Sequence, residues 1–92
     1  MSEERMTPGT YFQQRIEQRS REIAKARNDP GYVAMWPEAV KEVLEKFPNL
    51  SHEERASLRG NVEEQVKLMC TRTRRDPHMF TPALQEVARI LG

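Results

Sequence analysis

Apolar residues recur every three or four positions along most of this chain, which is the spacing of one face of an α-helix. The pattern is longest in the second half, where Leu58, Val62, Val66, Met69 and Thr73 form one continuous stripe. No stretch alternates apolar and polar residues in the way that predicts a half-buried strand. We therefore expect an all-α fold.

The helix that carries this stripe is expected over 52–75. Ser51 and Glu54 match a capping box, in which each side chain accepts a hydrogen bond from the backbone N–H of the other residue. Pro77 ends the helix, because the residue before a proline disfavours the helical conformation. Gly60 weakens the helix by roughly 1 kcal/mol relative to alanine. We interpret this glycine as the mark of a close helix crossing.

Three more helices are expected, over 10–28, 37–46 and 82–91. The first begins near Thr7 and Pro8, because proline suits the first helical position. A dense turn signal of Asn, Asp, Pro and Gly ends it. Its apolar stripe is narrow, so we expect this helix to be the least firmly held of the four.

Two further prolines set the expected starts of the second and last helices. A proline in a helix interior costs about 3 kcal/mol or more. The second helix is therefore expected to begin at Pro37, after a separate short turn of helix near 31–35. Thr81 is expected to cap the last helix, with Pro82 in its first turn.

These elements predict a compact bundle of about four helices, in which short loops favour antiparallel neighbours. Residues 8–92 are expected to form the single domain, and residues 1–7 a flexible tail. The stripe from Leu58 to Thr73 is longer than one thin core needs, which leaves a homodimer as an open alternative.

Charge and composition narrow the class of protein. The formal net charge is +1, from 15 Lys and Arg against 14 Asp and Glu, so this is not the strongly basic domain typical of nucleic-acid binders. No apolar run approaches the roughly 18 residues of a membrane span. The polar stretch 1–6 lacks the apolar core of a secretion signal. We expect a cytoplasmic protein with no membrane partner. An origin in a phage or another mobile element is compatible with such a small chain, but no residue points to it.

Residue types that carry chemistry are sparse. His52, His78 and Cys70 lack the short spacings of a zinc site, and Cys70 is the only cysteine, which excludes an intramolecular disulfide. Two pairs of adjacent glutamates lie about 100° apart on a helix and do not face each other. The sequence therefore predicts no catalytic residue, no cofactor and no metal site.

Two clusters of basic residues are the strongest remaining feature. One lies on the first helix and the other at the end of the third. Cations near a helix C-terminus complement the macrodipole, so both clusters are explained in part as solvated helix surface. Their functional interpretation is contact with an acidic protein or with nucleic acid. A helix-turn-helix is disfavoured, because Glu53 and Glu54 stand where the recognition helix would enter the groove.

The function that we expect is that of a non-enzymatic protein–protein interaction module. It would be a small adaptor, inhibitor or regulator that binds and occludes a larger partner, whose surface is acidic. The alternative is a nucleic-acid-binding regulator that uses the two arginine clusters. The aromatic group near Trp36 is interpreted as core, with an exposed hot spot as the alternative. The candidate partner-binding residues are Arg15, Ile16, Arg19, Arg21, Lys25, Tyr32, Met35, Trp36, Arg72, Arg74 and Arg75.

Overall fold

The computed structural model describes residues 6–28 and 30–92, and these form four α-helices and no strand. The elements are α1 (Pro8–Ala26), α2 (Gly31–Lys46), α3 (His52–Thr73), the short 3₁₀ helix η1 (Pro77–Phe80) and α4 (Thr81–Leu91). The expected all-α bundle is confirmed. Residues 1–5 of the expected tail lie outside the described residues. Thr7, which was also assigned to the tail, instead caps α1.

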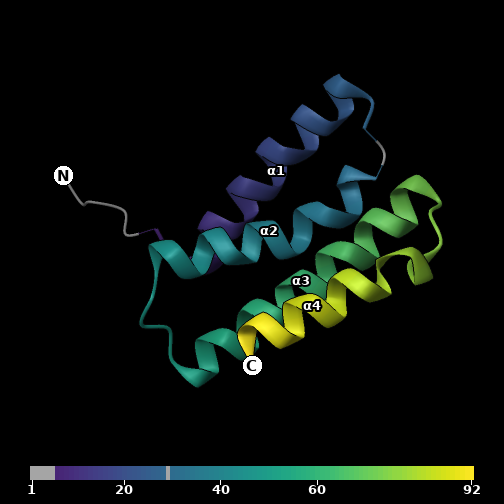
Figure 1. Cartoon of the computed structure of the whole chain (residues 1–92). Coiled ribbons are helices and arrows are strands. Elements are labelled where there is room, and N and C mark those ends of the chain that lie inside the picture. Colours follow the sequence, from purple (N-terminus) through teal and green to yellow (C-terminus); the bar gives the residue numbers. More distant parts are fainter. Residues whose placement is uncertain (1–5, 29) are drawn as a thin grey trace.

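The helices form two hairpins that pack against each other (Figure 1). In the first hairpin α1 and α2 run antiparallel, and in the second α3 and α4 do the same. Helix α2 joins the hairpins by packing on both α1 and α4. The direct contact between α1 and α3 is much smaller than either of these. The two helices therefore remain partly separated.

The core is built around α2, which contributes five of the buried side chains. An amphipathic helix normally buries one stripe, but a helix between two neighbours buries a wider face. The rings of Phe12 on α1 and Trp36 on α2 lie 6.1 Å apart at their centroids. The buried set is Phe12, Ile16, Met35, Trp36, Ala39, Val40, Val43, Leu58, Val62, Val66, Cys70, Phe80, Ala83, Val87 and Leu91.

Helix α2 passes through Pro37 without a break, so the expected start of the helix at this residue was wrong. Proline cannot donate a hydrogen bond to the carbonyl of Val33, and this loss is the cost that the sequence indicated. Trp36 and Val40, on either side of the proline, are both fully buried in the same core. Packing of this face therefore outweighs the local penalty.

Local capping signals were correct at two helix starts and wrong at a third. The Thr7 hydroxyl accepts from the N–H of Thr10 at 3.1 Å, and Ser51 and Glu54 form the complete capping box. Thr81 does not cap α4 but is already helical. The turn η1 runs directly into α4, and the cap lies upstream, where Asp76 accepts from the N–H of His78.

The stripe on α3 is used inside the single chain. Leu58, Val62 and Val66 are buried in the core, while Thr73 is exposed. These three buried residues are therefore not available to a second copy of the chain, and the homodimer stays a prediction.

Gly60 does not mark a helix crossing, which corrects the interpretation of the sequence. A Cβ built at this position meets no atom within 4 Å. We expect Gly60→Ala to raise the free energy of unfolding by about 1 kcal/mol, the difference in helix propensity. Urea denaturation measures this change. Gly31→Ala is the contrasting variant. The new Cβ would lie 3.0 Å from the Ile23 side chain, so the gain in stability expected at Gly60 is not expected here. A destabilised Gly60→Ala would contradict the open surroundings of this residue.

Two helices end on an arginine in the left-handed conformation, Arg27 with φ of 53° and Arg74 with φ of 55°. Glycine is favoured at such a position because it has no Cβ. We expect Arg74→Gly to stabilise the protein by about 0.5–1 kcal/mol in thermal unfolding. The control is Arg72→Gly, which lies within the last turn of α3 and should destabilise by a similar amount. Equal effects of the two variants would contradict the assignment of the cap.

Candidate functional site

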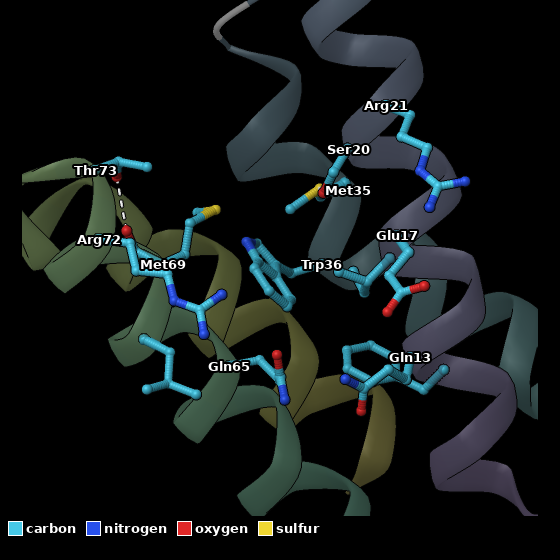
Figure 2. Close-up of a pocket in the computed structure, with 13 residues that line it drawn as sticks. Gln13, Glu17, Ser20, Arg21, Met35, Trp36, Gln65, Met69, Arg72 and Thr73 are labelled. Atoms are coloured by element: carbon cyan, nitrogen blue, oxygen red, sulfur yellow. Dashed lines mark hydrogen bonds between the residues drawn. The ribbon is translucent and has the colours of Figure 1, made fainter.

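A groove of about 380 Å³ lies between α1 and α3, where the two helices are partly separated (Figure 2). Its floor is apolar and consists of Phe12 and Ile16 of α1 with Met35 and Trp36 of α2. A volume of this size is within the range of ligand sites in proteins.

The groove stays open because the side chains on the facing walls are short, flexible or polar. Ser20 occupies the position where the apolar stripe of α1 would continue after Ile16. Its hydroxyl donates to the sulfur of Met35 at 3.6 Å and fills little space. On the α3 side the wall includes Gln65 and Met69. The two walls therefore do not interdigitate as tightly packed helices do.

Leu68 adds an exposed apolar side chain to the α3 wall. It is 44% exposed and lies off the stripe that packs into the core. Among the described residues, only Met6 and Met79 are comparably exposed large apolar side chains.

The indole nitrogen of Trp36 has no hydrogen-bond partner. Trp36 is 1% exposed, and its Nε1 is the only buried side-chain nitrogen or oxygen without a partner in residues 6–28 and 30–92. Figure 2 shows the indole between the walls, with its nitrogen turned toward the side where Met69 of α3 lies. An unsatisfied buried donor costs about 1–3 kcal/mol, so it needs an explanation.

Charged side chains stand along the rim of the groove. Arg21 and Glu17 belong to the α1 wall, and Arg72 belongs to the α3 wall (Figure 2). Within residues 6–28 and 30–92, the guanidinium groups of Arg21 and Arg72 form no hydrogen bond or ion pair. Two cations and one carboxylate therefore face the opening.

Two other members of the first basic cluster, Arg15 and Arg19, stabilise the fold. Arg15 forms two hydrogen bonds to the Glu42 carboxylate, at 2.9 and 3.0 Å. Arg19 bonds the same carboxylate at 2.8 Å and reaches Glu38 at 3.2 Å. The hydrogen bonds from Arg15 hold the pKa of Glu42 below its ordinary value, and Arg19 lowers it further. We call this set the Glu42 clamp, since it fastens α1 to α2.

The remaining candidate residues lie away from the groove. The Arg75 guanidinium lies 4.8 Å from the centre of the half-buried Tyr32 ring, Arg74 caps α3, and Lys25 is in the exposed last turn of α1. Of the residues expected at the interface, those that line the groove are Ile16, Arg21, Met35, Trp36 and Arg72.

The sequence missed several groove residues, chiefly Gln13, Leu68 and Met69. Of these three residues, only Leu68 could have been identified from the sequence, because it is an apolar residue that lies off the stripe of its own helix. The importance of Gln13 and Met69 depends on how α1 is placed against α3, and no local pattern encodes that placement.

Metal-ligating and thiol groups add no second candidate site in the described part of the chain. It contains no group of three or more His, Cys, Asp or Glu residues that could hold a metal ion, and Cys70 is buried. None of its helices is long and apolar enough to cross a membrane. No family model, curated protein or solved structure matches the chain. Its own geometry therefore has to support any assignment of function.

The Glu42 clamp should make stability depend on pH. Because the pKa of Glu42 is lowered in the folded state, its contribution is complete above the ordinary carboxyl pKa and is lost as the pH falls through the lower, folded value. We expect Glu42→Gln to cost about 1–2 kcal/mol at neutral pH and progressively less in acid.

Urea denaturation across a series of pH values measures this difference. The control is Glu45→Gln, which changes an exposed glutamate of the same helix. This variant should alter stability by less than about 0.5 kcal/mol. Equal effects of the two variants at neutral pH would show that the clamp contributes nothing.

Proposed function

We propose that this protein is a non-enzymatic interaction module, a small adaptor, inhibitor or regulator that binds and occludes a larger protein partner. The α1–α3 groove is the contact site. The observation that carries the proposal is the combination of an open apolar groove with a buried, unpartnered Trp36 N–H on its floor.

The composition of the groove fits a protein partner. Methionine and arginine are enriched at protein interfaces, and Met69 and Arg72 of the α3 wall supply both types here, next to the buried Trp36. Leu68 extends the apolar floor onto the open wall. The groove thus has an apolar centre and a polar, charged rim, which is the usual anatomy of an interface.

The shape of the molecule fits occlusion. Its principal extents are 39 × 31 × 20 Å, so its broad face exceeds the roughly 800 Å² that each partner buries in a standard interface. A chain of this shape that docks through the groove can cover a functional surface on a larger protein.

This proposal moves the interface away from the exposed basic face of α1. Arg15 and Arg19 are already engaged in the Glu42 clamp, so neither is available without a cost to the fold. The same engagement weakens the nucleic-acid alternative, which needs those cations for phosphate. Arg21 and Arg72, one from each cluster, line the groove outside the clamp.

Affinity capture from a lysate of the native host tests the proposal with two matched variants. Leu68→Glu places a charge in the groove, and Met79→Glu places one on η1, outside it. The two side chains are 44% and 46% exposed, so the fold should tolerate both changes. We expect the wild type and Met79→Glu to recover one larger protein in stoichiometric yield, with or without nuclease, and Leu68→Glu to lose it.

Other outcomes contradict the proposal in distinct ways. Equal recovery by Leu68→Glu and Met79→Glu would place the interface elsewhere on the molecule. Loss of the partner on nuclease treatment would favour the nucleic-acid alternative. A dimer in sedimentation that Leu68→Glu dissociates would make the occupant a second copy of the chain.

A further inference from the structure

We infer that the groove binds an acidic amphipathic helix of the partner, and that the Trp36 N–H donates a hydrogen bond to a side-chain acceptor on that helix. This inference rests on the proposed function and specifies the ligand of the same site. The length of the groove, the unpartnered N–H of Trp36 and the charges of the rim support it.

The length of the groove matches two turns of helix. Its α1 wall runs from Gln13 to Arg21 and its α3 wall from Gln65 to Thr73, each about 12 Å at 1.5 Å per residue. Residues i and i+7 of a docked helix are about 10.5 Å apart, so anchors at i, i+3 or i+4, and i+7 fit between the ends. The walls are themselves helices, which makes the site a helix-in-groove arrangement.

The Trp36 N–H favours an occupant that carries a polar acceptor over a purely apolar one. The donor is already buried and unsatisfied in the free protein, and an apolar occupant leaves that cost in place. A side-chain oxygen that reached the indole would instead form a hydrogen bond in a desolvated site, where it is strongest. Met35 and Met69 flank the indole, and methionine side chains change rotamer easily. They can therefore move to admit the acceptor.

Ser20 does not supply the missing acceptor. Its hydroxyl donates to the Met35 sulfur, and no acceptor from the described residues lies within hydrogen-bond distance of Trp36 Nε1. We assign this acceptor to the occupant.

Charge sets the direction of the docked helix. The C-terminal ends of α1 and α3 lie on the same side of the molecule (Figure 1), and Arg21 and Arg72 fall within the last two turns of these helices. These ends carry partial negative charge, so an antiparallel partner that brings its positive N-terminal end there is favoured. The first turn of a helix is also where Asp and Glu are preferred, and their carboxylates would meet Arg21 and Arg72. Glu17, one turn back on α1, repels acidic residues further along.

A displayed peptide library provides a probe that does not depend on knowing the partner. Its members are about four helical turns long, with apolar residues fixed at i, i+3 and i+7 and the other positions random. Peptides are selected on the wild type and counter-selected on Leu68→Glu. We expect the survivors to be enriched in Asp and Glu in the first turn and to share one polar acceptor near the middle.

Affinity measurements on the selected peptides separate the contributions of single residues. We expect Trp36→Phe, which keeps an aromatic ring but removes the donor, to weaken binding about tenfold. Arg72→Glu should weaken binding by a similar factor. Its control is Lys67→Glu, an equal charge change on the exposed face of α3 outside the groove, which should have less than about a twofold effect.

The indole resonance gives a readout on the unaltered protein, independent of any effect of Trp36→Phe on folding. Trp36 is the only tryptophan, so the protein has a single indole N–H signal in an NMR spectrum. We expect this proton to shift downfield and to exchange more slowly with solvent when a selected peptide binds.

The outcomes distinguish this inference from the proposed function. If no peptide survives counter-selection on Leu68→Glu, the groove is not a docking site, and both proposals fail. If peptides bind in the groove but lack the acidic first turn and leave the indole signal unchanged, the proposed function stands and this inference is overturned.

Discussion

Burial of α2 on two sides is the constraint on which the other helices depend. Trp36, Val40 and Val43 all lie on this helix, and each is fully enclosed. Helix α1 covers one side of α2 and α4 covers the other, so α3 is held mainly through its own hairpin with α4. A bundle arranged in this way closes tightly around its central helix, and it leaves the two outer helices, α1 and α3, only partly in contact.

The groove is a direct consequence of that arrangement. Phe12 and Ile16 are the buried residues of α1, and the next residue on the same face is the small, polar Ser20. Met69 of α3 lies on the far wall beside the indole of Trp36, and none of the described residues accepts a hydrogen bond from the indole N–H. In the proposed complex, an acceptor on the docked helix would satisfy this donor on the floor of the groove.

Local signals in the sequence predicted the elements well, because capping and turn chemistry depend on a few adjacent residues. The box formed by Ser51 and Glu54 is the clearest case. Prediction was wrong where packing between distant segments decides the outcome, as at Pro37, which the core holds inside α2. The sequence also could not predict the different roles of the arginines. Arg19 and Arg21 look equivalent in the sequence, but only the placement of α2 shows that one binds glutamates while the other faces the groove.

The Glu42 clamp has a consequence for the site that it does not touch. Arg15 and Arg19 lie on one flank of the Phe12–Ile16 stripe, and the groove opens on the other, so the clamp and the groove share α1 as a common wall. The clamp is electrostatic and about one quarter exposed, whereas the floor of the groove is apolar. Dissolved ions screen such pairs and leave apolar contacts largely intact. We therefore expect higher ionic strength to weaken the hold of the clamp on α1, the helix that also forms one wall of the groove.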